Sequence, residues 1–220
     1  MTIEEEVFKK YQIDLLKLEN YGFEFKDNTY VFKKDIGSDF EAIIKINLNG
    51  VVSGQVIDLN YNLEYSNIRL INPGSYALKI KEEYESILKD IALKCGIPKL
   101  FIFEQTNRIA KYIKDKYDIL PEYLFASTPD CGVYRNKKSK KWFGIIMQID
   151  KSKLDSASGL VEVMNVKVDD LAGDAVKKKG IYKAYHMSKK YWISMVLDNT
   201  LSDEEIIKYI DISYNLVKGE

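Results

Sequence analysis

The first twenty residues carry a helical pattern of apolar side chains. Thr2 and Glu5 have the spacing of a capping box, in which each side chain accepts a hydrogen bond from the backbone N–H of the other residue. Apolar residues then recur every three or four positions, at Ile3, Val7, Tyr11, Leu15 and Leu18. This periodicity predicts one amphipathic helix that extends to about residue 18.

Residues 21–70 have the pattern of antiparallel strands. Turn-forming residues separate runs of β-branched and aromatic side chains over 30–33, 41–48 and 51–59. The Asn49-Gly50 pair lies between the last two runs, and this dipeptide favours the tight turn of a β-hairpin. We therefore predict a hairpin within the first half of the chain.

A second helix is predicted between two sets of helix breakers. It begins after the turn Pro73-Gly74-Ser75, and Gly96 and Pro98 end it, with Gly96 expected in the left-handed conformation. Its expected core stripe consists of Ile80, Tyr84, Ile87, Leu88 and Ile91. The break at Gly96 to Lys99 is the predicted boundary between an N-terminal α+β domain, residues 1–97, and a second domain, residues 98–220.

The second half repeats the order of helix, strands and helix. A helix is predicted over about 105–117 and a closing helix after the Ser202/Glu205 capping box. Between them the pattern predicts strands over 133–136, 141–149, 160–168 and 191–197, and a short helix over about 170–179. The expected fold class is α+β, with two units that each contain an antiparallel sheet flanked by terminal helices. The similar order also raises the hypothesis of a diverged internal duplication.

Composition places the chain among ordinary globular proteins. Its 220 residues are 46% hydrophobic and carry 33 basic and 33 acidic side chains, which excludes the disordered, collagenous and disulfide-rich classes. Cys95 and Cys131 form no C-x-x-C pair, so two buried thiols are expected. The longest apolar run, from Trp142 to Met147, is too short to cross a bilayer, and the acidic start does not suit an export signal. We expect a cytoplasmic protein that does not bind membranes.

A single histidine restricts the enzyme chemistry that is possible. Zinc sites built on several imidazoles are excluded, and a histidine-activated nucleophile would have to use His186. The glycine motifs of phosphate loops, dinucleotide sites and nucleophile elbows are absent. Paired carboxylates stay open, although their order singles out no pair. We expect no enzymatic activity, no cofactor and no bound metal, with His186 a structural residue hydrogen-bonded where a strand begins.

The second half resembles a known family. From His186 the chain reads His-Met-Ser-Lys-Lys-Tyr-Trp, and further matching residues are Val196-Leu197-Asp198, Leu201-Ser202-Asp203, Ile210, Ser213 and Tyr214. With the earlier Val133-Tyr134-Arg135 and Trp142-Phe143-Gly144, this pattern resembles the MmcQ/YjbR family of small bacterial proteins over about residues 100–217. Residues 151–159 are longer than the family pattern, and residues 1–97 lie outside it.

The resemblance implies a CyaY-like, or frataxin-like, fold for the second domain. In such a fold a curved antiparallel sheet is covered on one face by two terminal helices. The resemblance implies no catalytic residues. Members are usually labelled DNA-binding because their fold is similar to the double-wing domain of a phage transcription activator, so the resemblance implies a double-wing contact with DNA.

Basic residues gather beside aromatic ones at two places. Residues 1–97 contain 12 basic and 16 acidic side chains, which leaves 21 basic and 17 acidic side chains for the second half. The hairpin cluster contains Arg135, Lys137, Lys138, Lys140 and Lys141, beside Trp142. The loop cluster contains Lys183, Tyr185, His186, Lys189 and Lys190, with three further lysines at 177–179. Such surfaces suit a nucleic-acid backbone. The sequence therefore predicts a non-enzymatic protein that binds double-stranded DNA through a lysine-rich wing.

Other interpretations of the same residues stay open. A lysine-rich turn also serves as a solvated tip that protects a sheet edge. Trp142 and Trp192 are expected mostly in the core, with Trp192 on the same face of its strand as Ser194 and Val196. Frataxin-like folds can hold iron on acidic helices, but the acidic run Glu4 to Glu6 suits the start of a helix better.

The alternative function is a protein-interaction or small-ligand module. In that case the acidic first domain would dock on a basic protein partner or on the second domain, and exposed tyrosines would contribute contacts. One structural feature separates the two functions. DNA binding favours both basic clusters on one continuous face free of acidic residues. Clusters on opposite faces, or clusters covered by the first domain, favour the interaction module.

Overall fold

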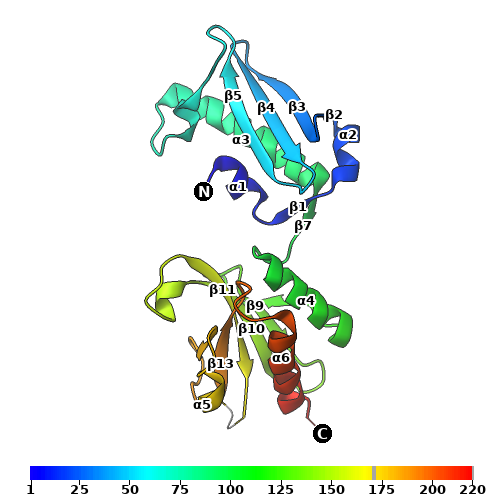
Figure 1. Ribbon diagram of the computed structural model, residues 1–220, viewed down its shortest axis with the longest axis vertical. Coiled ribbons are helices and arrows are strands. Elements are labelled where there is room, and N and C mark those ends of the chain that lie inside the picture. Colours follow the sequence, from blue (N-terminus) through cyan, green and yellow to red (C-terminus); the bar gives the residue numbers. More distant parts are fainter. Residues whose placement is uncertain (170–171, 220) are drawn as a thin grey trace. The chain divides into compact units, whose positions relative to one another are not determined.

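The chain forms two compact units, Met1–Lys99 and Leu100–Glu220. A computed structural model describes residues 1–169 and 172–219 of them (Figure 1). Each unit has its own hydrophobic core. The first unit includes Pro98 because strand β7, Gly96–Pro98, pairs antiparallel with β1, Tyr11–Ile13. The division therefore falls two residues beyond the boundary expected from the helix breakers.

The first unit is a five-stranded antiparallel sheet packed against one long helix. The strands follow the chain in order, as β2 (Glu24–Lys26), β3 (Thr29–Ile36), β4 (Phe40–Asn47), β5 (Val52–Asp58) and β6 (Leu63–Glu64). Helix α3, Ser75–Cys95, contributes its whole predicted stripe to the core, and this prediction is confirmed. The predicted hairpin joins β4 to β5, with Gly50 in the left-handed region.

The predicted single helix over the first eighteen residues is wrong. The capping box at Thr2 and Glu5 is present, but helix α1 spans only Ile3–Phe8. The chain then enters β1, a short 3-10 helix η1 (Leu15–Lys17) and helix α2 (Leu18–Tyr21). The pairing of β1 with β7 overrides the helical periodicity of this segment. The Asp14 carboxylate then starts η1 by accepting a hydrogen bond from the N–H of Leu16. Gly96 is extended rather than left-handed, because it enters β7 directly.

The second unit is a six-stranded antiparallel sheet with two long helices on one face. Helices α4 (Glu104–Tyr117) and α6 (Asp203–Val217) lie side by side (Figure 1). The strand order is β12 (Ile181–Lys183), β13 (Trp192–Val196), β11 (Leu160–Lys167), β10 (Trp142–Asp150), β9 (Gly132–Arg135) and β8 (Glu122–Tyr123). The predicted α+β class is confirmed. Residues 170 and 171 of the predicted short helix lie outside the described residues, and helix α5 spans Ala172–Ala175.

The two units differ in the order of their strands. The first sheet is a simple meander, whereas β13 in the second sheet lies between β11 and β12, although β12 precedes it in the chain. This difference argues against the hypothesis of internal duplication. The likeness lies in the order of helix, strands and helix along the chain and does not extend to the order of strands within the sheets.

Both faces of the second sheet are apolar. Phe143, Ile146 and Met164 point to the helices, where they join residues of α4 and α6 in the main core. The opposite face carries two smaller buried clusters, which include Val133, Ile145, Ile149, Val161, Val163 and Val196. Residues Cys131, Leu154, Tyr185 and Met187 pack against these clusters. Loops 124–131, 151–159 and 184–191 therefore cover this second face, which we call the loop-covered face.

Candidate functional site

The hairpin cluster lies on a turn that its own side chains organise. Asn136 is buried, and its side-chain oxygen accepts from the N–H groups of Lys138 and Ser139. The Ser139 hydroxyl donates to the carbonyl of Val217, which ties the turn to the end of α6. Lys140 has a positive φ of 60°, which lies in the left-handed region that several tight turns need at one position. The turn is thus held in one shape, with its lysines exposed.

Two members of the hairpin cluster are engaged by acidic residues. The Lys137 ammonium donates to the Asp118 carboxylate at 2.7 Å, and Arg135 Nε lies 3.3 Å from a carboxylate oxygen of Glu122. Hydrogen bonds from Lys114 and Lys137 lower the pKa of Asp118 to about 2. The sequence prediction gave all five cluster members the same role. The structure leaves Lys138, Lys140 and Lys141 exposed and, among the described residues, without an ion pair.

The loop cluster is anchored by two buried polar side chains. Asn165 of β11 and Ser194 of β13 are paired in the sheet and fully buried. The Tyr185 N–H donates to Ser194 Oγ at 2.9 Å, and Asn165 Nδ2 donates to the Tyr185 carbonyl at 2.7 Å. The Ser194 hydroxyl in turn donates to Asn165 Oδ1 at 2.6 Å. We call this arrangement the Tyr185 latch.

His186 follows the latch and is exposed. Its φ of 58° lies in the left-handed region, and its ring packs against the Tyr185 ring with centroids 4.0 Å apart. The predicted hydrogen bond at His186 is absent from the described part of the chain, so this prediction is wrong. The imidazole is exposed and packs on Tyr185 instead of bonding within the sheet. Lys183, Lys189 and Lys190 are also exposed, and Lys190 lies 5.0 Å from the centre of the Tyr191 ring.

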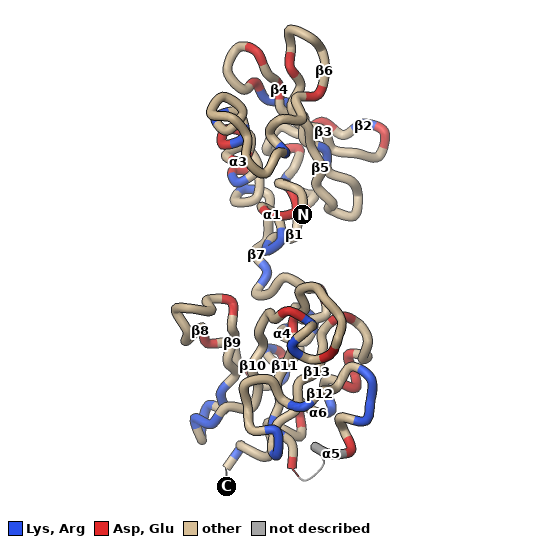
Figure 2. The backbone as a smooth tube through the Cα atoms, turned by 90° about the vertical axis from the view of Figure 1, so that its left-hand side faces the viewer, with Lys and Arg blue, Asp and Glu red and all other residues tan. Residues whose placement is uncertain are grey.

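The two basic clusters lie at the same end of the sheet. The hairpin cluster connects β9 to β10 and the loop cluster connects β12 to β13, and the antiparallel pairings make both connections leave at that end. They lie near opposite edges of the sheet. Figure 2 shows basic segments of this unit toward its C-terminal end, with acidic segments close by. Asp118 and Glu122 lie beside the hairpin cluster. The two basic clusters therefore leave the sheet at one end, but the surface around them is not free of acidic residues.

Two hollows adjoin the Tyr185 latch. The apolar hollow, about 580 Å³ in volume, lies on the loop-covered face, with Ile145, Met147 and Ile149 of β10 among its lining residues. The basic hollow, about 460 Å³, is lined by Lys153, Lys183 and Lys189. Tyr185 and His186 line both hollows. Trp142 is half-buried at the apolar hollow, where it meets Phe125 edge to face, so the prediction that it lies mostly in the core holds only in part. Trp192 is buried.

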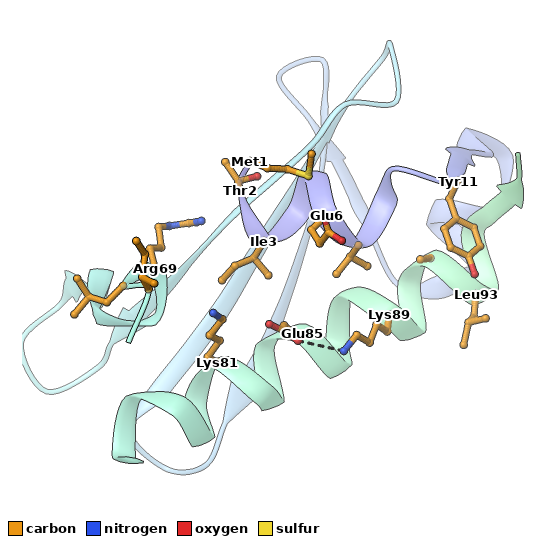
Figure 3. Close-up of a pocket in the computed structure, with 14 residues that line it drawn as sticks. Met1, Thr2, Ile3, Glu6, Tyr11, Arg69, Lys81, Glu85, Lys89 and Leu93 are labelled. Carbon is orange, nitrogen blue, oxygen red and sulfur yellow. Dashed lines mark hydrogen bonds and ion pairs between the residues drawn. The ribbon is translucent and has the colours of Figure 1, made fainter. Parts of the chain in front are cut away.

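The first unit has a larger groove between α1 and α3 (Figure 3). Its volume is about 950 Å³. Ile3 and Glu6 reach it from α1, and Lys81, Glu85 and Lys89 from α3, with an ion pair between Glu85 and Lys89. Charges of both signs around an apolar floor give no preference for an anion or a cation.

The acidic start of the chain has a structural role. Glu4 is buried, and both of its carboxylate oxygens accept from the Arg69 guanidinium, at 3.1 and 3.2 Å. The Tyr84 hydroxyl donates to the same carboxylate at 2.5 Å. Burial works to raise the pKa of Glu4, but the hydrogen bonds from Arg69 and Tyr84 outweigh it and hold the pKa below its ordinary value. Within the described residues no group of three or more metal-ligating side chains is present, and no helix could span a membrane.

Comparison with known sequences identifies the second unit. The sequence model of the YjbR family matches residues 114–216. The uncharacterized protein YyaQ of Bacillus subtilis (strain 168) is 34% identical over 112 residues, which cover 50% of this chain and 95% of YyaQ. The chain belongs to the YjbR family. The family resemblance predicted from the sequence is thereby confirmed, while the first unit lies outside the YjbR match.

Two solved structures of a protein from Pseudomonas syringae are similar to about half of this chain. The chain in the crystal structure is 35% identical in sequence to this one, with a TM-score of 0.49, and the match covers 50% of this chain and 96% of the Pseudomonas syringae chain. The chain in the solution NMR structure is 34% identical in sequence, with a TM-score of 0.49, and the match covers 52% of this chain and 94% of the Pseudomonas syringae chain.

Sequence reasoning missed the latch and the apolar hollow of this YjbR unit. The signal was present, because Asn165 and Ser194 are each flanked on both sides by apolar residues of their strands. A buried polar side chain needs hydrogen-bond partners, so each of them pointed to a partner elsewhere. The identity of that partner, the backbone of Tyr185, depends on the path of a loop that periodicity does not predict.

Proposed function

We propose that the second unit binds the phosphate backbone of duplex DNA, without base specificity and without enzymatic activity. The observation that carries the proposal is the common position of the two basic clusters at one end of the sheet. Two loops that emerge from the same end near opposite edges can contact one duplex together. This arrangement supports the double-wing contact implied by the family resemblance.

The contact residues are those lysines that no acidic residue engages. In the hairpin cluster they are Lys138, Lys140 and Lys141, and in the loop cluster Lys183, Lys189 and Lys190. Lys137 and Arg135 contribute less, because contact with phosphate would have to compete with Asp118 and Glu122. Tyr185 and His186 offer rings beside the loop lysines, on which an exposed base or sugar can pack.

The expected binding is weak and strongly dependent on salt. Each lysine that meets a phosphate releases condensed counterions, which lowers the logarithm of affinity by about 0.9 per tenfold increase in salt. If three to five of these six lysines meet phosphate at once, the slope is about −3 to −4.5. Phosphate contacts position a protein without reading a base, so duplexes of different sequence should bind alike.

Fluorescence anisotropy with a labelled duplex over a series of salt concentrations tests the proposal. The variant Lys138→Gln/Lys140→Gln/Lys141→Gln should bind less tightly, and its slope should be flatter by about three units if all three lysines meet phosphate. Substitution of Lys26, Lys45 and Lys79 by Gln is the matched control. It removes the same charge from exposed positions of the first unit and should leave the slope unchanged.

Two results would contradict the proposal. If the wild-type chain does not bind duplex DNA even at low salt, the interaction module becomes the better account. If the hairpin variant and the control flatten the slope equally, the interaction reflects overall charge, and the hairpin is not a wing.

A further inference from the structure

The apolar hollow of the second unit has the size and lining of a small-molecule site. Its volume of about 580 Å³ lies within the range of roughly 300–1,000 Å³ that is usual for ligand pockets. Trp142 and Met147 of β10 line it together with Phe125 and Met187 from the surrounding loops. Aromatic and thioether side chains of this kind fit flat apolar groups. A planar ring system is therefore the body that this hollow suits.

The neighbouring basic hollow supplies the opposite chemistry. Lys153, Lys183 and Lys189 line it, and the described residues offer none of these three an ion-pair partner. Ammonium groups gathered around one hollow favour an anionic group such as a carboxylate, sulfonate or phosphate. The hollow follows β12, the edge strand of the sheet, so an anion can enter it from solvent.

The Tyr185 latch fixes the ridge between the two hollows. Both hollows are lined by Tyr185 and His186, and the latch holds the Tyr185 N–H and carbonyl to side chains in the middle of the sheet. His186 keeps a left-handed backbone directly after it. Such strained non-glycine residues persist only where the surrounding structure holds them. The ridge is therefore preformed. The His186 imidazole N–H can donate a hydrogen bond to a ligand that occupies both hollows.

We propose that the two hollows form one site for a small amphipathic anion. The ring system of the ligand lies against Met147 and Trp142, and its acidic group lies among Lys153, Lys183 and Lys189, next to His186. A neutral apolar molecule would use only the first hollow, and an inorganic anion only the second. This inference goes beyond DNA binding and does not depend on it.

The fluorescent probe 8-anilino-1-naphthalenesulfonate tests the site, because it joins an aromatic body to one anionic group. The full-length chain should bind one equivalent, with blue-shifted emission. Its uncharged relative N-phenyl-1-naphthylamine should bind at least about tenfold more weakly, since it forms no charge-assisted hydrogen bonds. The variant Lys183→Gln/Lys189→Gln should weaken binding of the sulfonate about tenfold and leave binding of the uncharged probe unchanged.

Two further variants make the test specific. Met187→Glu places an acid at the apolar hollow and should abolish binding of the sulfonate. Lys138→Gln/Lys141→Gln is the matched control, because it removes the same charge from the hairpin and should bind the sulfonate like wild type. Urea unfolding followed by tryptophan fluorescence verifies that each variant folds.

Three outcomes would overturn the inference. They are no binding of the sulfonate to the wild-type chain, equal binding of the two probes, and equal loss in the Lys183/Lys189 variant and the hairpin control. Should Met187→Glu fail to fold, methyl NMR of the wild-type chain decides the location. Saturating sulfonate must then shift the Met147 and Met187 methyl signals, and unchanged signals refute the site. If the wild-type chain binds the sulfonate but does not bind duplex DNA, only the proposed function is refuted.

Discussion

Removal of the Asn165 side chain should release the Tyr185 latch and destabilise the second unit. In Asn165→Ala the Tyr185 carbonyl and the Ser194 hydroxyl each lose a partner inside the sheet. A buried polar group without a partner costs about 1–3 kcal/mol, so the two groups together predict a loss of about 2–6 kcal/mol in unfolding free energy. The exposed residue Asn215 offers the control Asn215→Ala, which should have a small effect of opposite sign, because alanine favours helices.

Urea unfolding followed by tryptophan fluorescence measures this loss. Trp142 and Trp192 are the two tryptophans of the chain, so the signal reports on the second unit alone. A double-mutant cycle of Asn165→Ala with Ser194→Ala should give a coupling energy of about 0.5–3 kcal/mol, as expected for side chains in one hydrogen-bond network. Hydrogen exchange at the Tyr185 N–H should accelerate in Ser194→Ala, since Ser194 is its acceptor.

The reasoning is refuted if the single variants lose less than about 0.5 kcal/mol, the range of ordinary surface substitutions. It is also refuted if the effects of the two variants are additive while exchange at Tyr185 is unchanged. Either result would mean that the loop keeps its shape without the buried amide and hydroxyl.

Three further predictions concern the rest of the chain. Because the pKa of Glu4 is lowered in the folded state, its stabilisation is present above the unfolded pKa of about 4.3 and is lost as the pH falls through the folded value. Glu4→Gln should therefore lower the unfolding free energy of the first unit by about 3 kcal/mol at pH 7 and by progressively less in acid. Far-UV circular dichroism measures this loss, and the unfolding transition seen by tryptophan fluorescence should stay unchanged. An equal loss at pH 7 and in acid would contradict this. Residues 99–220 alone should give a well-dispersed heteronuclear NMR spectrum, and a collapsed spectrum would show that the two units need each other. Screens with esters, phosphoesters and nicotinamide cofactors should detect no turnover that disappears in His186→Ala, and any such turnover would make the protein an enzyme.

Local sequence signals predicted the elements whose stability is local. The stripe of α3, the capping boxes at Thr2 and Ser202 and the Asn49-Gly50 hairpin all depend on neighbours in the chain, and the structure contains them. The segment around Tyr11 has the same helical spacing but pairs with β7, more than eighty residues away. Periodicity cannot report such a distant partner, so the helix was predicted too long.

The candidate site shows the same division between local and distant effects. Lysine content identified both basic clusters, because charge is a property of single residues. Whether a lysine is engaged depends on acids elsewhere, and Asp118 holds Lys137 across nineteen positions of sequence. The alternation of β13 predicted that Ser194 and Val196 share one face of the strand, but it did not indicate which face packs against the helices. Val196 lies in the core cluster of the loop-covered face, and Ile193 and Met195 lie in the helix-side core. The alternation could not predict that loops cover one face and leave a hollow beneath them.

The central claim is that the hairpin and loop clusters form one surface for a phosphate backbone. NMR titration of the full-length chain with a short duplex at low salt tests it most directly. The account predicts that backbone amide signals of residues 137–141 and 183–191 shift together, with one affinity, and that signals of the first unit stay unchanged. Shifts confined to one cluster, shifts spread over the first unit, or none at all would contradict it.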